Sequence, residues 1–266
     1  MPFDPGIGWA TLAALVAAAF AAGWVDAIVG GGGLIQLPAL LIGLPASASV
    51  PTISGTNKVP SACGTASAAL TYLRSLGVRW SSVVPLVVCS AIGSASGARL
   101  THLLDRNQFT PIVLAVILLV GVYTWRRPEL GLASHVRLTG RAATLRLCGI
   151  GVAVGLWDGF IGPGTGTFFL ILLVGVLGYE FLAATTLAKF ANLTTNLAAV
   201  GVFAAGGNIW WSVALPMAVG NLAGGIIGSR TAVSRGNSFV RRVFLVVVAA
   251  LALKLGWDTV AMVRGA

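Results

Sequence analysis

Charged residues are scarce in this chain and stand in short segments between long apolar runs. They make up 9% of its 266 residues, whereas a soluble domain carries about 25%. Several uncharged runs reach the roughly 20 residues that a helix needs to cross a bilayer. The sequence therefore predicts an all-α polytopic membrane protein.

The net charge of +10 does not indicate a nucleic-acid partner, because the arginines lie in the short segments between apolar runs. An excess of arginine in such loops is typical of the cytoplasmic side of a membrane protein. The three cysteines, Cys63, Cys89 and Cys148, are far apart and have no metal-ligand spacing. We expect no metal and no other cofactor, and we interpret Cys63 as an inert buried thiol.

The chain contains one pattern twice. In each half an aspartate, Asp26 or Asp158, precedes a glycine-rich stretch, and a lone lysine, Lys58 or Lys189, follows about a helix later. Tryptophan, proline, glycine and arginine positions of the two halves coincide at the same offset that separates the two lysines. The aspartates are one position further apart than the lysines, so the second glycine-rich stretch has one extra residue. So many coincidences indicate an internal duplication.

The apolar runs predict roughly eight full spans and two half-length segments. We expect Pro51, Gly55 and Pro60 to kink or interrupt the second span. The domains follow from the repeat: a first transmembrane repeat at residues 1–125, a basic linker at 126–146, and a second transmembrane repeat at 147–266. The expected full spans are residues 9–29, 46–73, 80–98, 109–125, 147–161, 180–205, 210–228 and 239–263, and the half-length segments are 34–44 and 167–177.

The arginines predict how the second repeat is oriented. If each half-length segment crosses the membrane, each half makes an odd number of crossings and the two repeats are inverted. The segments 74–79, 126–146 and 230–242 then share one face with 11 arginines, and the other face holds three. If the half-length segments enter and return, the split is 8 to 6. The positive-inside rule favours inverted repeats with a cytoplasmic linker.

Lys58 and Lys189 are the strongest functional signal. Their positions in the predicted spans place them near the middle of the bilayer, where a charge costs about 2.5–3.5 kcal/mol on insertion scales. Each lysine therefore needs a cavity or a partner. A structural salt bridge with Asp26 or Asp158 satisfies this need. The equivalent placement of both lysines favours a shared functional cavity.

The two glycine-rich stretches, residues 30–33 and 162–166, are called the glycine knots below. A backbone broken inside the membrane exposes unpaired N–H groups, which are tolerated where they line protein or water. The segments that start near Leu34 and Thr167 would direct the positive ends of two helices at the break. Inverted repeats with broken helices around a central site are typical of secondary transporters. Close helix packing is the alternative role of such glycines.

These arguments give a set of candidate site residues. Asp26 and Asp158 are interpreted as acids that couple a proton or cap the broken backbone. The candidate substrate-binding residues are the two lysines, the two asparagines next to them in helical register, and the glycine knots. They are Gly30, Gly31, Gly32, Gly33, Asn57, Lys58, Gly162, Gly164, Thr165, Gly166, Lys189 and Asn192.

The paired motifs resemble those of the TauE/SafE sulfite exporter family of bacterial membrane proteins. The likeness rests on the Asp26 motif with its glycine knot, on residues 54–58, and on residues 158–166 and 185–192 of the second half. It extends over nearly the whole chain. The resemblance implies a bacterial inner-membrane protein that transports small sulfur-containing anions such as sulfite or organosulfonates.

We therefore expect no enzyme but a secondary transporter of a small anion, sulfite or an organosulfonate, that works by alternating access. A proton as the coupling ion and a homodimer are compatible with this interpretation. An anion channel is one alternative. The other is an intramembrane hydrolase that uses Asp26 and Asp158 as an acid pair, although it gives the repeated lysines no role.

Overall fold

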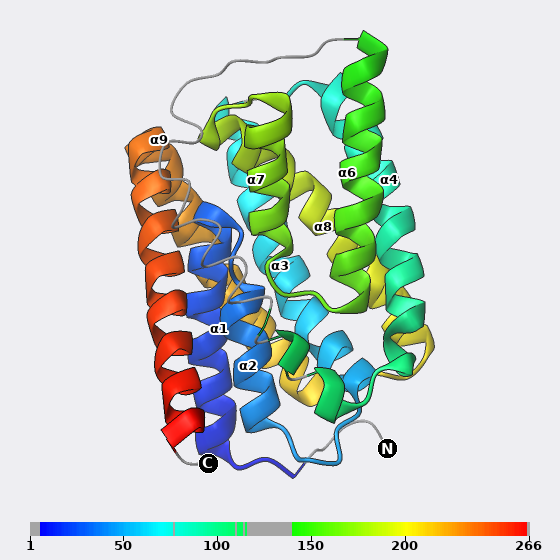
Figure 1. Cartoon of the computed structure of the whole chain (residues 1–266), viewed down its shortest axis with the longest axis vertical. Coiled ribbons are helices and arrows are strands. Elements are labelled where there is room, and N and C mark those ends of the chain that lie inside the picture. Colours follow the sequence, from blue (N-terminus) through cyan, green and yellow to red (C-terminus); the bar gives the residue numbers. More distant parts are fainter. Residues whose placement is uncertain (1–5, 77, 110, 114, 116–139, 265–266) are drawn as a thin grey trace.

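Helices make up the part of the chain that the computed structural model describes, which is residues 6–76, 78–109, 111–113, 115 and 140–264, and no strand occurs there (Figure 1). The fold is thus all-helical, as predicted. The elements are α1 (Trp9–Val29), α2 (Gly33–Gly43), α3 (Val50–Leu76), α4 (Trp80–Leu100), η1 (Thr101–Leu103), α6 (Gly140–Phe160), α7 (Thr165–Leu177), α8 (Phe181–Ala205) and α9 (Trp211–Arg264).

Both glycine knots break a helix. α1 ends at Val29, and Gly30 follows with φ +83° and donates its N–H to the Asp26 carbonyl. In the second half Gly162 and Gly164 also have positive φ, +98° and +80°. Glycine adopts this left-handed backbone without the steric cost of a Cβ. Residues 30–32 separate α1 from α2 and residues 161–164 separate α6 from α7, so the second knot has the predicted extra residue.

The repeat extends from the sequence to the helices. The starts of α3 and α8 are separated by the same offset as Lys58 and Lys189, and so are the starts of α4 and α9. Residues 46–73 were predicted to be kinked or interrupted; an interruption is wrong, because α3 is one helix of 27 residues that includes Pro60. Pro51 lies in its first turn, where the missing N–H has no intrahelical acceptor to lose.

Five helices of the described residues are long and apolar enough to cross a membrane, namely α1, α4 with η1, α6, α8, and α9 as far as Gly236. α3 is long enough, but polar residues reduce its mean hydropathy. α2 and α7, with 11 and 13 residues, are the predicted half-length segments. The predicted span 109–125 lies largely outside the described residues, whereas 239–263 belongs to α9, which bends at Gly236.

The outer surface of the bundle is apolar along its length. Val84, Val88 and Ile92 form one exposed row on α4, and Leu215 and Val219 lie exposed on α9. Exposed apolar rows at helical spacing are costly in water and are stable against lipid. Together with the five long apolar helices they identify a multi-pass membrane protein.

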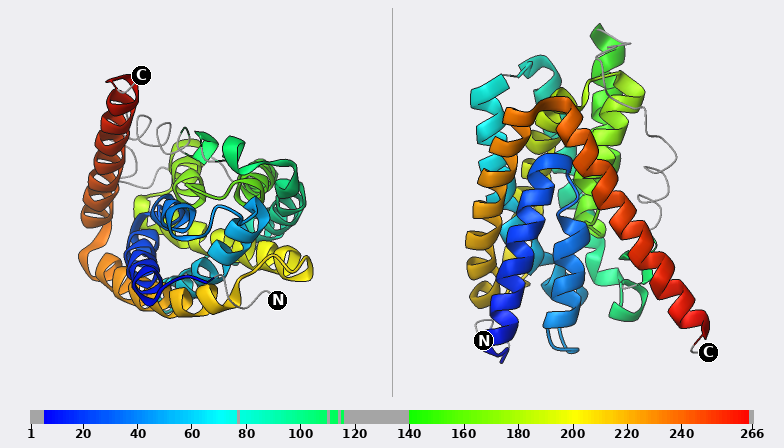
Figure 2. Two further views of the ribbon diagram at one scale, coloured as in Figure 1. Left: turned by 90° about the horizontal axis from the view of Figure 1, so that it is seen from below. Right: turned by 90° about the vertical axis from the view of Figure 1, so that its left-hand side faces the viewer.

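The two halves of the chain interlock through glycine contacts. α1 packs along α9 and α4 packs along α6, as Figure 2 shows from below. A Cβ on Gly97 of α4 would overlap the Leu156 carbonyl of α6, and one on Gly224 of α9 would overlap the Phe20 carbonyl of α1. These glycines therefore form close packing faces, and the two contacts are equivalent in the repeat, because α1 corresponds to α6 and α9 corresponds to α4.

Equivalent helices run in opposite directions in Figure 1. α1 rises from the lower end of the bundle, whereas α6 descends from the upper end. α2 and α7 both start near the middle of the bundle, from which α2 runs down and α7 runs up.

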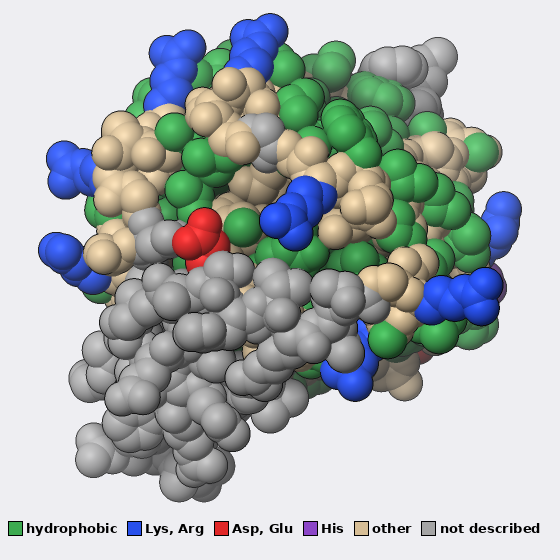
Figure 3. All heavy atoms as spheres, turned by 90° about the horizontal axis from the view of Figure 1, so that it is seen from above, with side chains coloured by type: hydrophobic (Ala, Val, Ile, Leu, Met, Phe, Trp, Pro, Cys, Tyr) green, Lys and Arg blue, Asp and Glu red, His purple; other side chains and the backbone are tan. Residues whose placement is uncertain are grey.

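The segments rich in arginine lie at one end. The turn between α3 and α4, the start of α6 and the bend of α9 at Gly236 are all at the top of Figure 1. Seen from this end, the surface carries Lys and Arg side chains around its rim (Figure 3). α6 begins at Gly140, within the basic segment 126–146, so Arg141 and Arg146 lie in its first turns.

The two glycine knots touch each other in the middle of the bundle. The N–H of Thr167 donates to the Gly30 carbonyl over 3.1 Å. A Cβ on Gly30 would overlap the backbone of Gly166. Gly30 is therefore required both by its positive φ and by this close approach.

Neighbouring glycines of the first knot provide a test of this contact. Gly30→Ala is expected to lower the free energy of unfolding by at least about 2 kcal/mol, because it combines left-handed strain with a backbone overlap. Gly31→Ala is the matched control, since its Cβ would meet the nearest atom at an ordinary 3.6 Å. Unfolding of the purified protein in mixed micelles measures both values, and equal stability of the two variants would contradict the knot contact.

Candidate functional site

Two buried ion pairs join the halves of the molecule. Lys58 Nζ lies 2.6 Å from Asp158 Oδ2, and Lys189 Nζ lies 2.8 Å from Asp26 Oδ2. Each lysine thus pairs with the aspartate of the other half. The Lys58 and Asp158 side chains are 3% and 2% exposed. Each lysine lies eight residues after the start of its helix, or about 12 Å along the axis.

Asp26 also caps the first glycine knot. Its Oδ1 accepts the N–H of Gly32 over 3.3 Å, and its Oδ2 accepts the Thr65 hydroxyl over 3.4 Å. Lys189 donates in addition to the Asp26 carbonyl oxygen. The predicted capping role therefore applies to Asp26, which stabilises the broken backbone and the lysine together.

A small polar cavity lies between the ion pairs and the glycine knots. It encloses about 20 Å³, which is enough for roughly one water molecule. It collects charged, amide, hydroxyl and glycine residues from both halves. The lining residues are Asp26, Gly30, Gly32, Gly33, Asn57, Lys58, Ser61, Asp158, Gly162, Gly164, Thr165, Asn192, Asn196 and Asn221.

Two helix N-termini border this cavity. Gly33 is the first residue of α2 and Thr165 is the first residue of α7, and both line it. The first N–H groups of a helix have no intrahelical acceptors and carry a partial positive charge. These N-termini add partial positive charge to a cavity whose lysine and aspartate charges are paired.

A buried hydrogen-bond chain orients one of the cavity amides. Gln36 Nε2 donates to the Asn57 carbonyl oxygen over 2.9 Å, and a carbonyl only accepts, so this bond fixes the glutamine amide. The same Nε2 donates to Asn57 Oδ1 over 2.7 Å, while Gln36 Oε1 accepts from Asn221. Asn57 therefore uses its oxygen on the protein and keeps its NH₂ group as a donor.

Asn192 has a similar arrangement. Its Oδ1 accepts from Asn196 Nδ2 over 3.5 Å, one turn along α8. The polar lining thus combines Lys58 with amide donors and helix N-termini, and its two carboxylates, Asp158 and Asp26, pair with Lys58 and Lys189. Such a set suits a small oxyanion that takes the place of a carboxylate.

Most of the predicted site residues come together here. Gly31, Gly166 and Lys189 are near the cavity but do not line it, although Lys189 holds Asp26, which does. The prediction missed Ser61 and Asn221 and did not include Asn196. It also missed Gln36. The signal for Gln36 was a single amide within the apolar helix α2, and Asn221 is the one amide in the span of α9 that ends at Gly236.

Metal binding has no support among the described residues, because no three His, Cys, Asp or Glu side chains cluster there. Cys63 is half-buried on α3 and is not one of the residues that line the cavity.

Neutral substitutions in the two ion pairs test which lysine pairs with which aspartate. Asp158→Asn alone leaves Lys58 buried without a counter-charge, and we expect it to cost about 3–5 kcal/mol of unfolding free energy. The neutral pair Lys58→Met/Asp158→Asn is expected to recover most of this loss. The mismatched pair Lys58→Met/Asp26→Asn strands one charge of each pair and is expected to be less stable than either single variant. Denaturation in micelles measures all five variants, including the singles Lys58→Met and Asp26→Asn, and recovery in the mismatched pair would refute the cross-half pairing.

Known proteins have sequences similar to this chain along nearly its full length. The family model described as Sulfite exporter TauE/SafE matches residues 15–255. A "Probable membrane transporter protein ORF9" of a Sinorhizobium species is 36% identical over 92% of both chains. A "Probable membrane transporter protein" of Haemophilus influenzae is 34% identical over 95% of this chain and 97% of its own.

The Escherichia coli K12 "Probable membrane transporter protein YfcA" is 31% identical over 93% of this chain and 90% of its own length. No solved structure matches the chain. The family match, the full-length relatives and the apolar helical fold agree, and the chain belongs to the TauE/SafE sulfite exporter family of membrane transporters.

Proposed function

We propose that this protein is a secondary transporter of a small anion, sulfite or a small organosulfonate, which binds between Lys58 and Lys189. The observation that carries this proposal is the pair of buried lysines, each neutralised by an aspartate of the other half beside a helix N-terminus. A site made of such donors favours an oxyanion over a cation or a neutral solute.

The ion pairs belong to the empty state of the transporter. A cavity of about 20 Å³ is too small for a four-atom anion such as sulfite. An incoming anion therefore displaces a carboxylate from its lysine and widens the cavity. Net charge in the site stays near zero if the displaced carboxylate takes up a proton, which would couple anion movement to protons.

Asp158 is the better candidate for this proton. Asp26 is held by Gly32, Thr65 and Lys189, so its displacement breaks several bonds. The Asp158 carboxylate pairs with Lys58 and is 2% exposed. Once an anion engages Lys58, a buried carboxylate without its partner is more stable neutral than charged.

Inverted repeats would allow the two halves to rock around the anion. The opposite directions of α1 and α6, and of α2 and α7, support this arrangement. The gathering of arginine-rich segments at one end supports an orientation with that end, including the linker, in the cytoplasm. Alternating access then exposes the site first to one side and then to the other.

The alternatives have weaker support. A hydrolytic acid pair needs two carboxylates that share a proton, but Asp26 and Asp158 each pair with a different lysine. An anion channel would show flux that does not saturate and no counterflow, and both are measurable in proteoliposomes.

Replacing the lysines tests the binding site. We expect Lys58→Met and Lys189→Met each to reduce uptake of radiolabelled sulfite into proteoliposomes by more than about tenfold, because each removes a charged donor worth about 1.5–3 kcal/mol. Lys254→Met is the control, since this third lysine belongs to neither repeated motif.

The variants are compared after size-exclusion chromatography, so that folded protein alone is assayed. To restore folding where it is lost, each lysine change is repeated together with the matching aspartate change. Full sulfite uptake by a folded Lys58→Met/Lys189→Met variant, with saturation and counterflow intact, would place the anion site elsewhere.

A further inference from the structure

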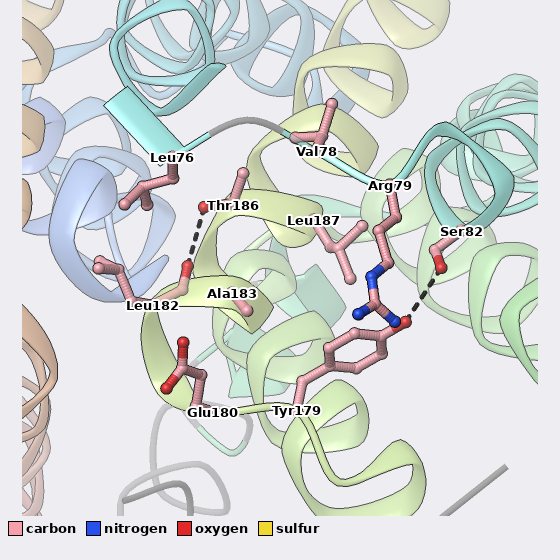
Figure 4. Close-up of a pocket in the computed structure, with 10 residues that line it drawn as sticks. All are labelled: Leu76, Val78, Arg79, Ser82, Tyr179, Glu180, Leu182, Ala183, Thr186 and Leu187. Carbon is pink, nitrogen blue, oxygen red and sulfur yellow. Dashed lines mark hydrogen bonds between the residues drawn. The ribbon is translucent and has the colours of Figure 1, made fainter. Parts of the chain in front are cut away.

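A second, larger cavity opens at the arginine-rich end of the bundle. It has a volume of about 490 Å³ and lies between the turn that joins α3 to α4 and the start of α8 (Figure 4). Polar groups on its wall come from Arg79, Ser82, Tyr179, Glu180 and Thr186, and leucine, valine and alanine side chains complete it. Its size exceeds that of the central cavity by more than an order of magnitude.

The polar groups of this cavity are arranged around a guanidinium group. Figure 4 shows Arg79 directed at the ring of Tyr179, with its guanidinium beside the tyrosine hydroxyl. That hydroxyl shares a 3.0 Å hydrogen bond with Ser82. The carboxylate of Glu180 points away from the guanidinium. An anion in this cavity would therefore meet the five donors of an arginine before it meets an acid.

The inner wall of the cavity leads to the central site. Leu182 and Thr186 precede Lys189 by seven and three residues on α8, and such positions lie on one face of a helix. Thr186 is only about 4.5 Å from Lys189 along the helix axis. Lys189 therefore lies within one helical turn of the cavity residue Thr186.

The repeat assigns a counterpart to this cavity at the opposite end. The offset between Lys58 and Lys189 also relates Gly55 to Thr186, Thr56 to Leu187, and Arg79 to Trp210. At that end the same segments are in close contact. The Trp210 N–H donates to Thr56 Oγ1 over 3.0 Å, and a Cβ on Gly55 would overlap the Asn208 carbonyl oxygen.

We propose that the cavity at Arg79 is the open vestibule for a small oxyanion, and that the contact of Gly55 and Thr56 with residues 208–210 is its closed counterpart. The two ends exchange these states: when the contact at Gly55 opens, the walls around Arg79 close. This inference rests on the proposed transport function and adds to it the two gates and the residue that first holds the anion.

A larger side chain at Gly55 tests whether the two ends exchange their open and closed states, and this test needs no transport assay. The reporter is Ala183→Cys, a half-buried vestibule position, in a background with Cys63, Cys89 and Cys148 replaced by alanine. A membrane-impermeant maleimide labels it in the state described here. Gly55→Ala keeps α3 helical, since alanine is the better helix former, but prevents the far contact. We expect the labelling rate to fall several-fold.

Gly201→Ala on α8 is the matched control, because its Cβ would meet no atom within 4 Å. Thr56→Val removes the acceptor of the Trp210 N–H and weakens the same contact without an overlap. It should also lower the labelling rate, by less than Gly55→Ala does. If a folded Gly55→Ala or Thr56→Val variant is labelled at an unchanged or faster rate, the proposed exchange between the two ends is wrong. Reduced labelling in a protein that moves no anion would leave the gates in place and refute the transport function.

Arginine substitutions at the same end test the vestibule as an anion site. Arg79→Gln is expected to raise the KM for radiolabelled sulfite several-fold with little change in kcat, because it weakens capture and leaves the central lysines intact. Arg74→Gln removes the same charge from an exposed position outside the cavity. Both residues are exposed, so both variants should fold. An equal effect of the two substitutions on KM would show that Arg79 contributes only general surface charge.

Discussion

Two lysines buried at membrane depth are the constraint on which the structure depends. An ammonium group without a counter-charge is too costly there, and each of these lysines finds its carboxylate in the other half of the chain. The halves therefore cannot separate without stranding four charges. The glycine contacts of α1 with α9 and of α4 with α6 then bring the backbones close enough for the pairs to form. Charge pairing and glycine packing thus support the same arrangement.

The same ion pairs connect stability to transport. Under the proposed function, an anion that binds the lysines would compete with the bonds that hold the two halves together, so its binding would be coupled to their rearrangement. Asp26 and Asp158 differ in this respect, because the former also caps the first glycine knot through Gly32. Asp26 and Asp158 therefore occupy equivalent positions of the repeat but differ in their hydrogen bonds to the backbone.

Local signals in the sequence predicted the helices and their ends. Which side chains pair in the site depends on tertiary contacts, which the sequence does not show. The length of an apolar run and the glycines that end it gave α2 and α7, because both depend on neighbouring residues. The partner of Lys58 did not follow, since Asp26 and Asp158 are equally good acids until the fold brings one of them near. Gln36 acts through a hydrogen bond to the Asn57 carbonyl, which no spacing rule contains. The continuity of α3 through Pro60 likewise reflects packing that overrides the local preference.

A duplicated sequence predicts two equivalent ends, yet the molecule has one open and one closed. The cavity at Arg79 and the contact at Gly55 occupy corresponding places in the repeat. Equivalent segments thus enclose a cavity at one end and are in close contact at the other. Corresponding residues differ where the ends differ: Arg79 lines a cavity, whereas Trp210 donates its backbone N–H to Thr56 and packs, partly buried, against an apolar cluster. An arginine keeps its end hydrated and attractive to anions, whereas a tryptophan favours a sealed apolar contact. In the proposed transport cycle, this difference would give the two ends of the molecule different gates, although the residues between the ends come from matching positions of the repeat.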